Sequence, residues 1–226
     1  MQAKDIMTTD VVTVDREMDV TSIARILLNH RISAVLVVDE HGHVLGVVSE
    51  SDLMRRSGRD PGRSWWLSLV ADQKMKLLHR EGARAKDIMT HDVIYTAKEA
   101  SLSEVARVLE SNHVKRLPVI EGGRLVGIVS RADVLQGLAA SGREDEPTIE
   151  DWDIRAGIIE LMRRRGGVSM QSVNVIVLHR EVFLWGIVED NEDRAAISGA
   201  AEGLVGVGKV HNFLNTLFEV ARGVSN

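Results

Sequence analysis

The sequence predicts an α+β protein made of two copies of one β-α-β-β-α unit, followed by a smaller α-β-β-α-β domain. Three observations carry this prediction. The block AKDIMT occurs twice, at Ala3–Thr8 and at Ala85–Thr90. Each block precedes the same order of elements, which closes with GVVSESD at Gly46–Asp52 and with GIVSRAD at Gly127–Asp133. After the second copy the hydrophobic pattern changes, which indicates a separate domain.

The first copy contains every element of one unit. Val11–Val14 is short and β-branched, which predicts a strand. Asp19 can cap the following helix, whose apolar residues recur at helical spacing. Ala34–Val38 and Val44–Val48 are apolar runs on either side of a turn glycine, so they predict a hairpin. A second helix then completes the copy.

The second copy repeats this order. Val93–Tyr95 predicts its first strand, and Ser101 with Glu104 predicts a capping box at the start of its first helix. Leu117–Ile120 and Leu125–Val129 predict the hairpin. One deletion lies in the hairpin turn, where an insertion or deletion is tolerated if the flanking strands are real.

The repeats set the predicted domain boundaries. These are copy one over 1–56, a connecting segment over 57–84, copy two over 85–138, a linker over 139–147 and a C-terminal domain over 148–226. One copy alone buries little surface, so we expect the two to pack sheet to sheet as a module with approximate two-fold symmetry. In the connecting segment, Trp65 and Trp66 need a partner surface, either the module or a dimer interface.

The C-terminal domain is predicted from caps and alternating strands. The expected elements are a helix over Ile149–Arg165, strands over Ser172–Leu178 and Glu181–Val188, a helix over Asn191–Gly203 and a last strand within Val207–Val220. Thr148 with Asp151 can cap the first helix, and Asp190 can cap the second. Gly186 lies inside a strand, where glycine permits a bulge or the close approach of another backbone.

Composition and charge narrow the function classes. The net charge is −5, from 28 basic and 33 acidic residues, so nothing indicates bulk attraction to nucleic acid or anionic lipid. The chain has no cysteine, which excludes disulfides, thiolate catalysis and zinc–thiolate sites. The first residues lack the features of a signal peptide, and no stretch has the length of a membrane span. We therefore expect a cytoplasmic protein.

The D-x-M-T block, the helix, the apolar strand pair and the G-h-V-[ST]-x-x-D motif together resemble the CBS domain. The resemblance covers residues 3–56 and 85–138. It implies a disc-shaped, usually dimeric module that often binds adenosine nucleotides and regulates an attached or partner protein. The implied ligand is AMP, ADP, ATP or a dinucleotide, and no cofactor is required.

Ser49 with Asp52 and Ser130 with Asp133 lie where a strand enters a helix, and each pair has two interpretations. The first is a capping box, in which serine and aspartate satisfy backbone N–H groups. The second is a ligand site, in which the helix N-terminus and serine bind phosphate while aspartate accepts the two ribose hydroxyls. CBS domains use the matching residues in the second way. The interpretations are compatible, and we favour ligand binding.

Four further residues complete the predicted ligand sites. The family often has threonine in the first strand, and Thr13 fits, whereas the second copy has Tyr95 there with Thr96 beside it. Lys115 and Arg116 could neutralise phosphate charge, although a solvated surface pair is the alternative. Because the copies differ in this way, we predict one good nucleotide site and one altered or empty site.

The C-terminal order of elements, with FLWGIVED and GVGKVHNFL, resembles the BON domain, a bacterial module. BON domains have been proposed to bind phospholipid surfaces or other macromolecules. Residues 148–226 hold 8 basic and 11 acidic side chains, which gives 8 − 11 = −3 and does not favour anionic membranes. The basic run Arg163–Arg165 ends a predicted helix, where cations complement the helix dipole.

No catalytic set or metal-ligand spacing emerges from the sequence. Together with this absence, the resemblance to CBS domains implies a non-enzymatic signal-transduction protein, in which an adenosine-type ligand changes the packing of the two copies. The C-terminal domain would then contact an unknown protein or phospholipid target, and the module would form a homodimer. The alternative is a dimeric structural adaptor that tethers to phospholipid or envelope surfaces without sensing nucleotide. Nucleotide hydrolysis would need a metal site and an activated nucleophile, and neither is predicted.

Overall fold

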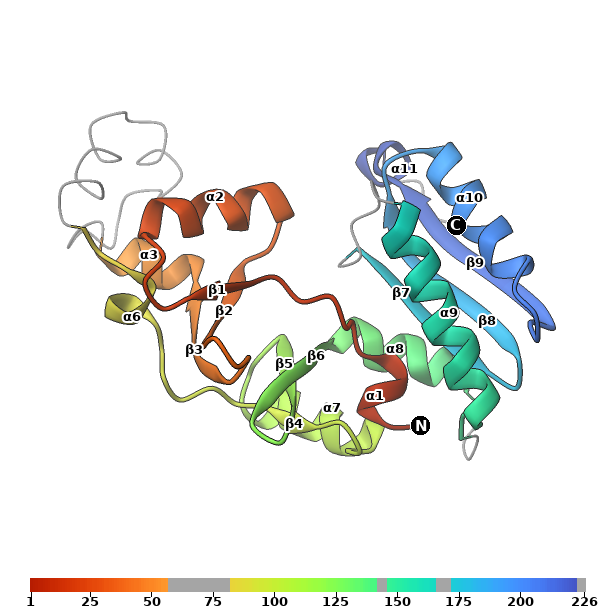
Figure 1. Cartoon of the computed structure of the whole chain (residues 1–226), viewed down its shortest axis with the longest axis horizontal. Coiled ribbons are helices and arrows are strands. Elements are labelled where there is room, and N and C mark those ends of the chain that lie inside the picture. The colour runs from red at the N-terminus through yellow and green to blue at the C-terminus, as the bar shows by residue number, and fades with distance from the viewer. Residues whose placement is uncertain (57–81, 142–145, 166–171, 223–226) are drawn as a thin grey trace. The chain divides into compact units, whose positions relative to one another are not determined.

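A computed structural model describes residues 1–56, 82–141, 146–165 and 172–222 of the chain (Figure 1). The predicted α+β class is confirmed, with three separate three-stranded sheets in the described residues. Contacts divide the chain into two compact units. The first unit holds residues 1–11, 94–121 and 126–226, and the second holds residues 12–93 and 122–125. Trp65 and Trp66, which were predicted to need a partner surface, lie outside the described residues.

The second unit contains most of the first copy. Its elements are β1 (Thr13–Asp15), α2 (Val20–His30), β2 (Ala34–Val38), β3 (Val44–Ser49), α3 (Glu50–Arg56) and α6 (Ala85–Ile88). The sheet has the order β1-β2-β3, with β1 parallel to β2 and β2 antiparallel to β3. Asp19 caps α2 by accepting a hydrogen bond from the Ser22 N–H at 2.9 Å, as the sequence predicted.

The first unit contains the second copy and the C-terminal domain. The copy contributes β4 (Thr96–Ala97), α7 (Leu102–Ser111), β5 (Arg116–Glu121), β6 (Arg124–Ser130) and α8 (Arg131–Ala140), and the N-terminus adds α1 (Ala3–Ile6). The sheet has the order β4-β5-β6, with β4 parallel to β5. The predicted capping box of Ser101 and Glu104 is present at the start of α7.

Each AKDIMT block packs on the copy that it does not precede in sequence. The N–H and C=O groups of Thr8 pair with those of Ile128 at 2.9 Å, and Thr90 pairs with Val47 in the same way. A Cβ on Gly127 would lie 2.6 Å from Met7 Sδ, and one on Gly46 would lie 2.8 Å from Met89 Sδ. The glycine of each closing motif therefore makes room for the methionine of the other block.

Both first strands begin later than the sequence predicted. The structure starts β1 at Thr13 rather than at Val11. The predicted strand Val93–Tyr95 is wrong, because β4 covers only Thr96–Ala97. The preceding β-branched residues have strand propensity but lie beyond the parallel register of the neighbouring strand. Strand propensity reports a fit to a pleated surface, and the available partner sets the boundary.

The C-terminal domain follows the predicted order and adds one short helix. Its elements are α9 (Ile149–Arg165), β7 (Val173–Leu178), β8 (Glu181–Val188), α10 (Asn191–Glu202), β9 (Lys209–Thr216) and α11 (Leu217–Ala221). The last strand was predicted within Val207–Val220, but it ends at Thr216. Thr216 and Glu219 form a capping box, which starts α11 and corrects the prediction.

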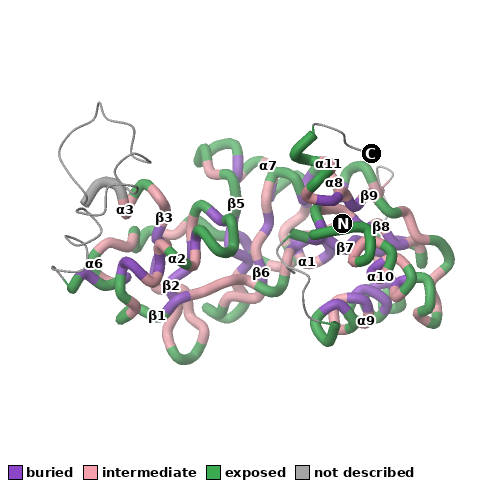
Figure 2. Tube along the Cα trace, turned by 90° about the horizontal axis from the view of Figure 1, so that it is seen from above, coloured by how far each residue is buried: buried purple, intermediate pink, exposed green. Residues whose placement is uncertain are grey.

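The sheet of this domain is covered on both faces of its first strand. Alternate residues Val173, Val175 and Val177 join a core with α9 and α10, which cover one face of the sheet (Figure 1). Ile176 points the other way and joins the buried cluster of the second copy. Every residue of β7 is therefore buried (Figure 2).

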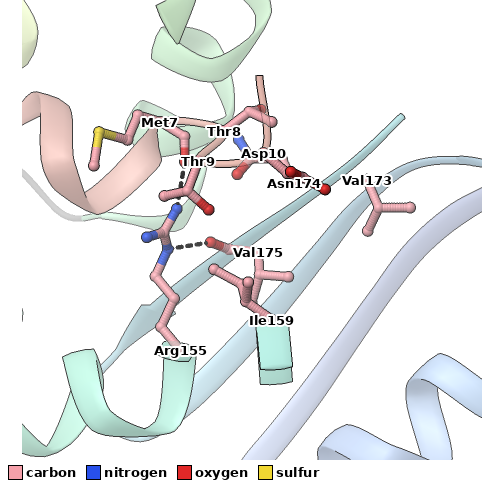
Figure 3. Close-up of a pocket in the computed structure, with 9 residues that line it drawn as sticks. All are labelled: Met7, Thr8, Thr9, Asp10, Arg155, Ile159, Val173, Asn174 and Val175. Carbon is pink, nitrogen blue, oxygen red and sulfur yellow. Dashed lines mark hydrogen bonds between the residues drawn. The ribbon is translucent and has the colours of Figure 1, made fainter. Parts of the chain in front are cut away.

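Arg155 of α9 connects the C-terminal domain to the segment around α1 (Figure 3). Its Nε donates to Val175 O at 2.7 Å, its Nη2 to Met7 O at 2.5 Å and its Nη1 to Lys4 O at 3.3 Å. Burial lowers the pKa of the guanidinium to about 10, so it stays charged at neutral pH. The carbonyls at the end of α1 have few helical partners, and Arg155 supplies donors for two of them.

We predict that Gly186→Ala lowers the free energy of unfolding by about 2 kcal/mol or more. The residue has a φ of +138°, and an added Cβ would lie 2.0 Å from Ser172 O. Chemical denaturation measures the effect. The matched control is Gly199→Ala in α10, where an added Cβ meets nothing within 4 Å. We expect the control to be neutral or stabilising by about 0.5–1 kcal/mol, and equal effects at both sites would contradict the prediction.

We predict that Arg155→Met lowers the free energy of unfolding by at least about 3 kcal/mol, because three carbonyls lose a charged donor in a buried place. The matched control is Arg163→Met, which breaks an exposed pair with Glu160 and should cost at most about 1 kcal/mol. Denaturant titration of both variants compares them. A loss below about 1 kcal/mol at Arg155 would show that the contact contributes little.

Candidate functional site

In the first copy, Ser49 ends β3 and Asp52 lies in the first turn of α3. The Ser49 N–H donates to Asp52 Oδ2 at 2.9 Å, and the Ser49 hydroxyl donates to the same oxygen at 2.5 Å. Among the described residues, no hydrogen bond reaches Asp52 Oδ1. The aspartate therefore caps the helix with one oxygen and leaves the other for a further donor.

In the second copy, Ser130 and Asp133 form the same cap at the start of α8. The Ser130 N–H donates to Asp133 Oδ2 at 2.6 Å, and the Asp133 N–H donates to Ser130 Oγ at 3.2 Å. The capping interpretation of both Ser-x-x-Asp pairs is therefore realised in the structure. Capping and ligand binding remain compatible, because the cap uses one carboxylate oxygen of each aspartate.

The two aspartates differ in what meets the second oxygen. Asp133 Oδ1 accepts a hydrogen bond from the Asn174 side chain of β7 at 3.0 Å, and Asp133 is 9% exposed. Burial raises the pKa of Asp133, against the hydrogen bonds from Ser130, the charge of Arg116 and the hydrogen bond from Asn174. The second copy's aspartate is therefore covered by the C-terminal domain.

Sequence reasoning missed Asn174. Its Nδ2 also lies 3.1 Å from Ile6 O and 2.9 Å from Gln136 Oε1, so three acceptors share two hydrogens. Its Oδ1 is buried and has no partner among the described residues. The available signal was one amide in the apolar run VNVIVL, since a buried polar group in a strand needs a partner elsewhere.

The predicted threonines occupy different positions in the two copies. Thr13 is half-buried and pairs with Leu36, next to the strand that ends at Ser49. Thr96 pairs with Val119, which corresponds to the buried position of Val14 in the first copy, and Thr96 is itself buried. Tyr95 takes the position of Thr13 and is 59% exposed. Thr96 is thus placed in the core side of its strand.

The predicted cations lie beside the start of α8. Lys115 O accepts a hydrogen bond from the Arg131 N–H at 3.3 Å, which places Lys115 next to the first turn of the helix. Arg116 begins β5, and its charge acts on Asp133. Both side chains are exposed. The structure thus brings Lys115, Arg116 and the Ser-x-x-Asp pair of the second copy to one end of that copy.

Over the described ranges, no group of three or more histidine and acidic side chains could hold a metal ion. Within the same ranges, we find no helix with the length and apolar character of a membrane span.

Known proteins share part of this chain. An uncharacterized protein of Methanocaldococcus jannaschii is 27% identical over 154 residues, which cover 61% of this chain and 91% of that protein. Hypoxic response protein 1 of Mycobacterium tuberculosis is 27% identical and is matched over 84% of its length by 60% of this chain. Two other relatives, from M. jannaschii and Thermofilum pendens, are longer, and the matches span 31% and 35% of them.

Solved structures show similar partial matches. The CBS domain of a membrane protein from Sphaerobacter thermophilus is 29% identical, with a TM-score of 0.49 over 60% of this chain and 86% of that one. CBSX2 in complex with AMP is 25% identical, with a TM-score of 0.48 over 61% of this chain and 96% of that one.

The family models agree with both resemblances drawn from the sequence. The CBS domain model matches residues 3–59 and 85–140, and the BON domain model matches residues 150–217. Both predicted families are confirmed. The chain therefore belongs to the CBS domain family and carries a tandem CBS pair followed by a C-terminal BON domain.

Proposed function

We propose that this chain is a non-enzymatic regulatory protein whose CBS pair binds an adenosine-type nucleotide and whose BON domain contacts a target. The ligand is AMP, ADP, ATP or a dinucleotide. The target is a protein or a phospholipid surface, and the working form is a cytoplasmic homodimer. Membership of the CBS domain family supports the ligand class.

The observation that carries the proposal is the geometry of Asp52. Its Oδ2 accepts both hydrogen bonds of the cap, and no described residue donates to its Oδ1. A carboxylate oxygen in this position can accept hydrogen bonds from vicinal hydroxyls, which a ribose presents. Capping uses one carboxylate oxygen, so the other is available to accept hydrogen bonds from a ligand.

The contrast between the copies supports unequal sites. Asp52 is half-buried and its Oδ1 has no described donor, whereas Asp133 is buried and bonded to Asn174. We propose that the first copy provides the accessible nucleotide site. The second copy brings Lys115 and Arg116 near its own Ser-x-x-Asp pair, so it keeps cations suited to phosphate.

We predict that Asp52→Asn weakens AMP binding about tenfold or more, because hydrogen bonds to a charged group contribute about 1.5–3 kcal/mol. The amide keeps one oxygen for the cap of α3 but replaces the second acceptor by a donor. Isothermal titration calorimetry with AMP and with ATP measures the change.

The matched control is Asp153→Ala on α9, an exposed aspartate of the BON domain. Its affinity for AMP should equal that of the unmodified chain. If the Asp52→Asn variant bound AMP as tightly as the unmodified chain, Asp52 would serve only as a helix cap. If neither AMP nor ATP produced heat with the unmodified chain, the adenosine-type ligand would be wrong. Co-sedimentation with phosphatidylglycerol vesicles in the absence of nucleotide would then favour the tethering adaptor.

A further inference from the structure

The contact between the BON domain and the second CBS domain has a polar centre. Asn174 reaches Asp133 and Gln136 of α8, and Arg155 reaches the carbonyls around α1. At the edge, Trp152 Nε1 donates to Asp5 Oδ1 at 2.8 Å, and the Lys4 ammonium lies 4.0 Å from the centroid of the Trp152 ring. Polar contacts of this kind are typical of interfaces between domains that separate and rejoin.

An apolar sheet face surrounds this polar centre. Ile176 of β7 belongs to the buried cluster of the second CBS domain, and Phe183 and Trp185 of β8 pack against that cluster. Trp185 is the register partner of Asn174, so both side chains lie on the same face of the sheet. The BON domain therefore uses the face opposite to its helices for this contact.

The contact leaves two buried polar atoms without partners. Asn174 Oδ1 and Trp185 Nε1 have no hydrogen bond among the described residues, and both lie on the docking face. Buried polar groups are nearly always paired in native structures, so an unpaired group needs an explanation, such as a water molecule, an ion or a functional role. Water would satisfy both atoms if the domain moved away, which lowers the cost of separation.

We propose that the BON domain and an adenosine-type ligand compete for Asp133, so that the docked BON domain closes the second nucleotide site and ligand binding there releases it. This inference rests on the proposed function, because it gives the ribose the same role at Asp133 as at Asp52. Asn174 is the residue of the BON domain that holds the site closed.

The competition follows from the bonds of Asp133. Its Oδ2 is committed to the cap of α8, as Oδ2 of Asp52 is committed to the cap of α3. Its Oδ1, the oxygen that would face a ribose, is bonded to Asn174. A ribose hydroxyl therefore cannot bond to Asp133 Oδ1 in the same way unless it displaces the Asn174 side chain.

Release would uncover a specific surface. The docking face presents Ile176, Phe183 and Trp185, with the Trp185 ring stacked on Phe213 at a centroid distance of 4.1 Å. Aromatic side chains are enriched at protein interfaces, so a face of this kind can bind the apolar surface of a partner protein. The ligand would then act by differential affinity, since it binds the undocked state at the second site and the docked state excludes it.

The test measures AMP binding at the second site after the first site is weakened by Asp52→Asn. In this background we expect Asn174→Ala to raise the affinity for AMP about tenfold, within the range of about 5- to 150-fold that is typical of coupling between sites. Trp152→Phe in the same background removes a different docking bond without touching Asp133, and it should raise the affinity in the same direction.

The matched control is Asn212→Ala, an exposed asparagine of β9 whose side chain bonds the backbone of its own strand. It should leave AMP affinity unchanged, and thermal melts confirm that each variant is folded. If the unmodified chain binds AMP through Asp52 but neither Asn174→Ala nor Trp152→Phe changes the second affinity, the competition is refuted and the proposed function stands. If AMP and ATP bind no variant, both proposals fail together.

Discussion

The buried guanidinium of Arg155 is the interaction on which the arrangement of the first unit depends. It bonds Val175 O within the BON domain and two carbonyls at the end of α1, so one side chain joins three segments. A buried cation is costly unless it is fully hydrogen-bonded, and here the acceptors come from separate parts of the chain. The nearby charges of Asp5 and Asp133 favour the charged form. In the docked state these carbonyls satisfy the buried guanidinium, and the same docking places Asn174 against Asp133.

The two AKDIMT blocks are identical in sequence but differ in the contacts that they make. Each block packs its methionine against the glycine of the other copy's closing motif, Met7 on Gly127 and Met89 on Gly46. The block that forms α1 has an additional role, because its carbonyls accept hydrogen bonds from Arg155 and Asn174. The blocks share the packing of a methionine on a glycine of the other copy. They differ because the block that forms α1 also contacts the BON domain.

The sequence predicted most of the elements, the caps and the families, because these depend on local patterns. Asp19, Ser101 and Thr148 each cap the helix that they were predicted to cap. Gly186 has a positive φ, a conformation that favours glycine. The sequence did not reveal that each AKDIMT block packs on the other copy. The order of the blocks along the chain does not say which copy each block contacts. The role of Asn174 was also beyond it, because the contact with Asp133 spans 41 positions. Thr96 shows a third limit of the sequence prediction. It lies one residue after the position that matches Thr13, and adjacent residues of a strand point to opposite faces, so its side chain lies in the core.

The most direct test of ligand-driven release is a distance measurement by pulsed electron paramagnetic resonance. The chain has no cysteine, so Glu110→Cys on α7 and Ala195→Cys on α10 give one spin label on each domain at exposed positions. Excess unlabelled protein suppresses distances between protomers. We expect one narrow distance distribution without ligand and a broad distribution at longer distances at saturating AMP. An unchanged narrow distribution, in a sample whose second site is shown by calorimetry to be occupied, would contradict it.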